Sequence, residues 1–187
     1  MNLCVYGASS DLIDPAYLTE GERLGERMAQ RGHGLVFGAG QTGMMGALAR
    51  GMAKHGGTII GVAPKFFDEP GVLYQECTEM IFTETMRQRK EIMEERADGF
   101  IMTPGGIGTY EEFFEILTLK QLGRHNKPIG ILNTAGCFDD LARLLEDTAA
   151  RGFMGEHCLK LYYIADTPEE LLEYMENILS ADVADDI

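Results

Sequence analysis

The segment PGGIGTYEE, at positions 104–112, places a glycine-rich turn directly before two glutamates. Backbone N–H groups at the start of a helix bind anions, whereas neighbouring carboxylates repel them. We predict a phosphate site here, formed by Gly105, Gly106, Gly108 and Thr109. No GK[ST] sequence follows, so the turn is not a Walker A loop and hydrolysis of a nucleoside triphosphate is not expected.

The two glutamates have different prospects on a helix over 108–122. Glu112 shares a face with Thr109 through the three-to-four spacing, and Glu111 points about 100° away. A position in the first helical turn, with a cation nearby, favours the ionised form of Glu112. That form suits a base, a nucleophile or a group that stabilises positive charge. For Glu111, a favourable interaction with the helix dipole is the better interpretation.

The counter-charge comes from MRQRK, at 86–90, in a chain with 16 basic and 30 acidic residues. Met86 and Met93 follow helical spacing and predict a face that packs on a sheet, with Arg89 and Lys90 against it. The next strand leads into the PGG turn. This basic cluster therefore supplies local positive charge, although a solvated basic surface is the alternative.

Two further glycine turns follow predicted strands. GASS, at 7–10, fits a plain turn, in which Ser9 or Ser10 is able to donate to a ligand. GAGQTGMMG, at 38–46, satisfies GxGxxG, but no acidic residue ends the next strand, so dinucleotide binding is not expected. Close packing of a helix, or contact of Gly40 and Gly43 with a smaller nucleotide, fits this turn better.

Short apolar runs alternate with amphipathic segments along the chain. We predict strands at 3–7, 34–38, 58–63, 77–82, 99–103, 128–133 and 161–165, and helices at 15–31, 42–55, 85–97, 108–122, 138–151 and 168–179. This order predicts a doubly wound, Rossmann-like α/β fold, a parallel sheet with helices on both faces. One domain spans 1–187, with 180–187 as a frayed tail. Ligands in such folds bind at the carboxyl ends of the strands.

Composition narrows the classes of partner. The net charge of −14 and the pI of about 4.6 argue against a nucleic-acid surface and against an anionic membrane. The four cysteines form no CxxC pair, so we expect no metal site. The first residues are too quickly polar for a signal peptide, and no apolar run has membrane-spanning length. We expect a soluble, cytoplasmic protein.

With these residues identified, the sequence resembles the Lonely Guy family of cytokinin riboside 5′-monophosphate phosphoribohydrolases, often mislabelled lysine decarboxylases. The glycine turn matches PGGxGTxEE at every fixed position, and Met86, Arg89 and Lys90 match the basic motif of the family. The resemblance covers most of the chain. The departures from the family pattern are Ala39, Arg87, Gln88 and Leu119.

The resemblance implies hydrolysis of the N-glycosidic bond of AMP or an N6-substituted AMP, releasing the base and ribose 5-phosphate. It assigns catalysis to Arg89 and Glu112, with no cofactor or metal, in a homodimer. We expect the nucleoside monophosphate to be the partner. Further candidates for substrate contact are Ser9, Gly40, Gly43, Met86, Lys90, Glu111 and Thr118.

A different class would use the same turns. A non-catalytic nucleotide or molybdenum-cofactor carrier of this fold needs the glycine turns but not Arg89 and Glu112 together, so their presence favours the enzyme. Lysine decarboxylation fits less well, because we find no motif for a lysine that forms a Schiff base with a cofactor.

Overall fold

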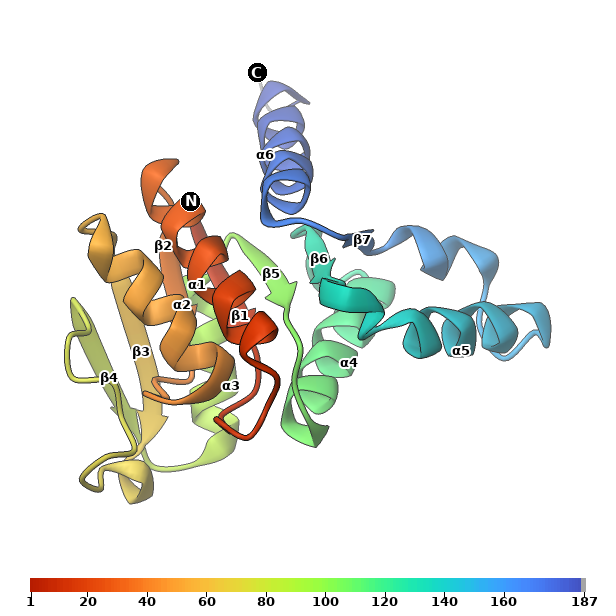
Figure 1. The fold of residues 1–187 in the computed structure, drawn as a ribbon. Coiled ribbons are helices and arrows are strands. Elements are labelled where there is room, and N and C mark those ends of the chain that lie inside the picture. Colours follow the sequence, from red (N-terminus) through yellow and green to blue (C-terminus); the bar gives the residue numbers. More distant parts are fainter. Residues whose placement is uncertain (186–187) are drawn as a thin grey trace.

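The computed structural model describes residues 1–185 and contains one parallel sheet of seven strands in the order β4-β3-β2-β1-β5-β6-β7 (Figure 1). The strands are β1 (Asn2–Tyr6), β2 (Gly34–Phe37), β3 (Ile59–Pro64), β4 (Glu79–Thr83), β5 (Gly99–Met102), β6 (Ile129–Leu132) and β7 (Tyr163–Ala165). The predicted doubly wound α/β fold is confirmed.

Six α-helices and three short 3₁₀ segments connect these strands within residues 1–185. The helices are α1 (Pro15–Gln30), α2 (Gly43–Lys54), α3 (Met86–Arg96), α4 (Ile107–Gln121), α5 (Asp139–Ala150) and α6 (Pro168–Asp185), and the 3₁₀ segments are η1 (Lys65–Phe67), η2 (Thr134–Gly136) and η3 (Glu156–Lys160). Helix α6 continues past the predicted end at 179 into the segment expected to fray, and 186–187 lie outside the described residues. None of these helices has both the length and the apolar character that a membrane crossing requires.

The central strand β1 shows how the sheet is buried on both faces. Leu3 and Val5 join the core formed with α1, α2 and α6, whereas Cys4 and Tyr6 join the core formed with α3, α4 and α5. Figure 1 shows α1 and α2 in front of the strands and α3 behind them. Side chains of a strand alternate between faces, so a strand that is apolar at every position needs a helical layer on each side.

The position of β1 also decides where a ligand can enter. It pairs with β2 on one side and β5 on the other, and the chain leaves these strands toward opposite faces of the sheet. At such a switch point the loops at the carboxyl ends separate and leave a crevice. The three glycine turns of the sequence are therefore brought together at one edge.

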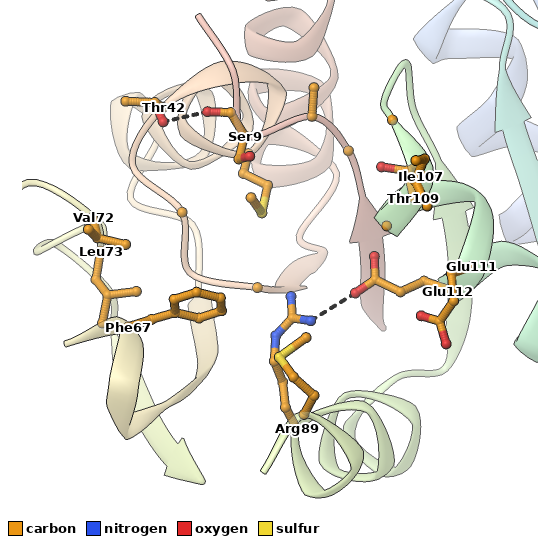
Figure 2. A pocket seen from close by; sticks show the side chains of 18 of the residues that line it. Ser9, Thr42, Phe67, Val72, Leu73, Arg89, Ile107, Thr109, Glu111 and Glu112 are labelled. Atoms are coloured by element: carbon orange, nitrogen blue, oxygen red, sulfur yellow. Dashed lines mark hydrogen bonds and ion pairs between the residues drawn. The ribbon is translucent and has the colours of Figure 1, made fainter. Parts of the chain in front are cut away.

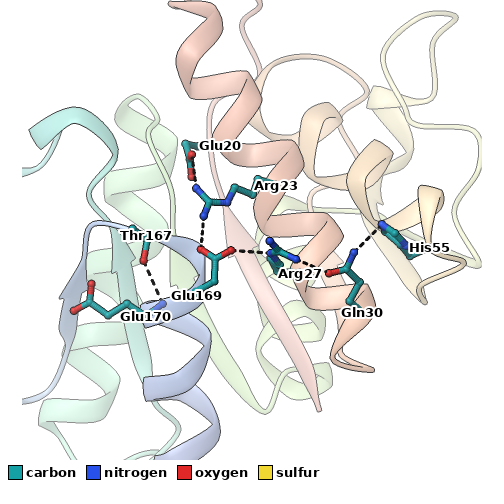
Figure 3. A network of polar contacts seen from close by, with 8 residues as sticks. All are labelled: Glu20, Arg23, Arg27, Gln30, His55, Thr167, Glu169 and Glu170. Carbon is teal, nitrogen blue, oxygen red and sulfur yellow. Dashed lines mark hydrogen bonds and ion pairs between the residues drawn. The ribbon is translucent and has the colours of Figure 1, made fainter.

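A polar network joins the last helix to the first. Glu169, in the first turn of α6, accepts hydrogen bonds from Arg23 Nη2 at 2.8 Å and from Arg27 Nε at 2.7 Å, and Arg27 continues to Gln30 (Figure 3). Burial acts to raise the pKa of Glu169, but the hydrogen bond from Arg27 and the charge of Arg23 outweigh it and lower the pKa. The ion pairs thus fix α6 against α1 while Glu169 is ionised.

We expect Glu169→Gln to lower the free energy of unfolding at pH 7 by about 0.5–1 kcal/mol, a modest loss because the side chain is 33% exposed. Since the folded pKa lies below the ordinary value of 4.5, this stabilisation is present above that pH and disappears as the pH falls through the folded pKa. Urea denaturation at pH 7 and at pH 3 would measure it. The matched control is Glu173→Gln, on an exposed position of the same helix. A loss of equal size at both pH values would contradict the prediction.

Candidate active site

The turn after β5 leads into α4, whose N-terminus has no side-chain cap. Gly106 is the N-cap of α4 (φ −99°), and no side chain accepts a hydrogen bond from the first N–H groups of that helix. The backbone N–H groups of Ile107, Gly108 and Thr109 therefore face the cavity edge without an intrahelical partner. A Cβ atom on Gly106 or Gly108 would meet no atom within 4 Å. The missing side chains leave open space at the positive end of a helix, as an anion site requires.

Arg89 and Glu112 form a buried ion pair beside this turn. Arg89 Nη1 lies 2.9 Å from Glu112 Oε1, and Arg89 Nε donates to the carbonyl oxygen of Val62 at 3.2 Å (Figure 2). The two side chains are only 9% and 12% exposed. A Cβ atom on Gly38 would lie 1.9 Å from Arg89 Nη2, so the absence of a side chain at Gly38 makes room for the guanidinium.

The expectation that Glu112 gains its ionised form from the helix start is wrong in two respects. The helix begins at Ile107, which puts Glu112 in the second turn, where the dipole effect has largely decayed. Burial is the largest influence and raises the pKa of Glu112, and the charge and hydrogen bond of Arg89 only partly offset it. The sequence shows the neighbouring cation but not the depth at which the carboxyl lies.

Lys90 lies outside the cavity, contrary to its prediction as a substrate contact. Its Nζ is 2.5 Å from Glu111 Oε1 and 2.7 Å from Glu115 Oε2, on the outer side of α4. Arg89 and Lys90 are adjacent on α3 and so diverge by about 100°. Thr118 is exposed and does not line the cavity either. Glu111, the other further candidate for substrate contact on α4, does line it.

The loop that follows the first glycine turn packs against the second glycine turn, at 38–46, and binds its backbone. The N–H of Gly43 donates to Asp11 Oδ1 at 2.7 Å, and Thr42 Oγ1 donates to the carbonyl oxygen of Ser9 at 2.6 Å. A Cβ atom on Gly43 would meet the carbonyl oxygen of Ala8 at 2.4 Å. Gly43 therefore packs two loops together and does not line the cavity, whereas Ser9 and Gly40 do. The start of α2 is closed by the chain itself.

Gly105 also has a packing role. A Cβ atom there would lie 2.1 Å from Thr109 Oγ1 and 3.0 Å from the backbone nitrogen of Ala8, and Gly105 does not line the cavity. The lack of a side chain at Gly105 thus allows a close approach between two turns, and its contact with phosphate stays a prediction. Ile107, which sequence reasoning missed, lines the cavity at the start of α4, with a side chain that is 89% exposed. Because Ile107 is the variable position of the glycine motif, its residue type did not indicate a contact with the ligand.

These parts enclose a cavity of about 610 Å³ at the carboxyl ends of the central strands (Figure 2). One end holds the α4 N-terminus and the Arg89–Glu112 pair. The lining also contains five apolar side chains: Phe67, Val72 and Leu73 lie across the cavity from α4 (Figure 2), and the other two are Met45 and Met86. Met86, expected to pack on the sheet, is 41% exposed because it begins α3 at the cavity mouth. The segment 65–74 was not predicted as part of the site. The adjacent pair Phe66 and Phe67, in a segment expected to be a loop, was the sequence feature that pointed to it.

Metal ligation has no visible basis in the described part of the chain. Within residues 1–185, no group of three or more His, Cys, Asp or Glu side chains is arranged to hold a metal ion.

Because burial raises the pKa of Glu112, we expect its carboxyl to titrate above the ordinary glutamate value of 4.5. Carbon-13 NMR of protein labelled at the glutamate carboxyl groups would follow the titration, with Glu112→Gln identifying the signal. In Arg89→Met the pKa should rise further, since the offsetting cation is lost. A midpoint at or below 4.5 in the unaltered protein would show that Arg89 outweighs burial.

Comparison with known proteins places the chain. The model of a family described as "possible lysine decarboxylase" matches residues 45–175. The cytokinin riboside 5′-monophosphate phosphoribohydrolase LOG2 of Arabidopsis thaliana is 33% identical over 93% of this chain and 82% of its own length. The phosphoribohydrolase LOG of Oryza sativa subsp. japonica is 34% identical over 93% of this chain and 72% of its own length.

Solved structures agree on the fold. The molybdenum cofactor carrier protein of Chlamydomonas reinhardtii superposes with a TM-score of 0.73 at 22% identity, covering 96% of this chain and 98% of its own. The molybdenum cofactor binding protein of Rippkaea orientalis gives a TM-score of 0.70 at 22% identity, covering 95% of each chain. At this identity the likeness shows the architecture alone. The family match and the closer sequence relatives decide the assignment: this chain belongs to the LOG family, that of the cytokinin riboside 5′-monophosphate phosphoribohydrolases.

Proposed function

We propose that the protein hydrolyses the N-glycosidic bond of a nucleoside 5′-monophosphate, AMP or an N6-substituted AMP, to the free base and ribose 5-phosphate. One observation carries the proposal. A buried Arg89–Glu112 pair lies in the same cavity as the uncapped N-terminus of α4. The names of the family relatives point to the same reaction class.

The phosphate of the substrate binds at the start of α4. The N–H groups of Ile107, Gly108 and Thr109 donate to its oxygens, and the helix dipole favours its charge. Thr109 adds a hydroxyl, which is buried near the turn. Binding of the phosphate fixes the ribose in the cavity beside Glu112. Such positioning lowers the activation barrier by about 7–11 kcal/mol in the best intramolecular reactions.

Glu112 acts on the sugar. As the bond from C1′ to the base nitrogen breaks, positive charge develops on the ribose, as in other glycosyl transfers. The ionised carboxylate stabilises that charge and accepts a proton from the attacking water, whose oxygen forms the new bond to C1′. Burial strengthens this interaction because little water screens it. The base leaves with the bonding electron pair and takes up a proton from solvent, and Glu112 releases its proton to solvent at the end of the cycle.

Arg89 holds Glu112 in place. It remains protonated, so it does not transfer the proton to the leaving base. Its hydrogen bonds to the Val62 carbonyl and to Glu112 fix the orientation of the carboxylate. The apolar wall of Met45, Phe67 and Val72 offers a surface for the base and for a substituent on its N6 atom.

The carrier alternative predicts a different result. A nucleotide or molybdenum-cofactor carrier would bind its ligand without turnover, and it would not need a carboxylate paired with arginine beside the sugar. Release of ribose 5-phosphate from AMP therefore separates the two proposals. The homodimer and the cytoplasmic location stay predictions, which sedimentation and cell fractionation would test.

We expect Glu112→Gln to reduce ribose 5-phosphate release from AMP by about 10²- to 10⁴-fold, because the neutral amide neither stabilises the ribose charge nor accepts a proton. Binding of AMP, measured by calorimetry, should change much less. Glu173→Gln, far from the cavity on α6, serves as the control of equal chemistry. Intact turnover in Glu112→Gln would remove Glu112 from the mechanism.

Gly108→Ala separates packing from binding. The added Cβ meets no protein atom within 4 Å, and alanine favours helix, so the free energy of unfolding should stay equal or rise by up to about 1 kcal/mol. The same Cβ tilts toward the helix N-terminus, where the phosphate binds. We expect kcat/KM for AMP to fall by about tenfold or more, while the affinity for adenosine changes little. Full activity of this variant would place the phosphate elsewhere.

A further inference from the structure

Five charged side chains meet where α3 crosses the start of α4. Arg89 and Lys90 follow one another on α3, and Glu111 and Glu112 follow one another on α4. The pairs match one to one, since Arg89 binds Glu112 and Lys90 binds Glu111. Glu115, the fifth, shares Lys90 with Glu111. Two cations thus face three carboxylates beside a site that receives a dianion.

Glu111 is the carboxylate that would repel an anion at the start of α4. It lines the cavity and is separated from Thr109 by a single residue. Its carboxylate nevertheless turns away from the Arg89–Glu112 pair, toward α3, as Figure 2 shows. The partner that holds it there is Lys90 Nζ, at 2.5 Å.

Lys90 suits this role by its position and chemistry. Its side chain is 22% exposed and lies outside the cavity lining, so it does not reach the phosphate end itself. An ammonium group has three donors and is able to bridge two carboxylates. Glu111 and Glu115 are one helical turn apart on α4 and would repel one another without a cation between them.

We propose that Lys90 is a positioning residue: it holds the Glu111 carboxylate out of the phosphate end of the cavity and neutralises it, so that α4 is able to receive an anion. The inference rests on the proposed function, because it assumes a phosphate at the N-terminus of α4. A phosphomonoester carries about −1.5 to −2 charges near pH 7, so an unpaired Glu111 would oppose its binding.

Other ionisable groups also lie near Glu112. The ionisable groups that act on Glu112 are Arg89 and Lys90 from α3, Glu111 from α4, and Tyr6 and Cys4 from β1. Burial raises the pKa of the Cys4 thiol to about 12 and raises that of Tyr6 above its usual value, so both stay neutral near pH 7. Lys90 is the cation in this set that is not already committed to Glu112.

Lys90→Met tests the role, because methionine keeps most of the length of the side chain and removes its charge. We expect the dissociation constant for AMP, measured by calorimetry, to rise about 5- to 30-fold, and KM to rise with it. Binding of adenosine, which lacks the phosphate, and kcat for AMP should stay within about threefold. Lys90→Arg should restore AMP affinity.

The double variant Lys90→Met/Glu111→Gln distinguishes control of the Glu111 carboxylate by Lys90 from a purely structural role of Lys90. If Lys90 acts by controlling Glu111, removing the carboxylate should return AMP affinity to within about threefold of the unaltered protein. Glu111→Gln alone should leave AMP affinity equal or improved. The proposal is overturned if the double variant stays as weak as Lys90→Met, if adenosine weakens equally, or if Glu111→Gln loses affinity.

These outcomes are separable from failure of the proposed function. If the unaltered protein binds AMP but releases no ribose 5-phosphate, the hydrolase proposal fails and the Lys90 comparison still holds on binding alone. If it binds neither AMP nor ribose 5-phosphate, both proposals fail. Circular dichroism melting would confirm that each variant is folded.

Discussion

The ion pair between Arg89 and Glu112 is the contact on which the site depends. It joins α3 to α4 across the carboxyl ends of the strands and is almost fully removed from water. Removing a charge pair from water is costly, and further hydrogen bonds offset part of that cost; Arg89 donates one from Nε to the carbonyl oxygen of Val62. The open backbone at Gly38 leaves room for the guanidinium. Strand ends, a glycine and two helices thus converge on one pair.

Two glycine-rich turns lead into helices beside the cavity, α2 and α4, and the two helix starts differ in whether their first N–H groups are satisfied. Asp11 satisfies the start of α2 through the N–H of Gly43, whereas the start of α4 has no side-chain cap. Both follow glycine-rich turns. The difference lies in whether a neighbouring loop of the chain reaches the free N–H groups. Whether a helix start is able to bind an anion therefore depends on its N–H groups being left without a partner, as well as on its sequence.

Charge balance at the crossing of α3 and α4 accounts for the proposed binding of an anion by an acidic protein. The chain carries a net charge of −14, and three carboxylates lie at the crossing of α3 and α4. Arg89 and Lys90 divide these carboxylates between the inner and outer sides of α4. The inner pair remains in the cavity, where we propose that it acts on the sugar. The outer cluster, in the same proposal, keeps negative charge away from the phosphate end.

The sequence by itself determined the layers, the order of elements and the motif that marks the site, because apolar periodicity and glycine turns are local properties. The predicted α/β fold and family resemblance are confirmed on that basis. Local reasoning failed where burial or a distant loop decided the outcome: it could not see that Glu112 is desolvated, that Gly43 and Gly105 serve packing, or that Lys90 faces outward. Nor could it find the apolar wall around Phe67. Those facts depend on contacts between segments far apart in the chain, which only the tertiary structure decides.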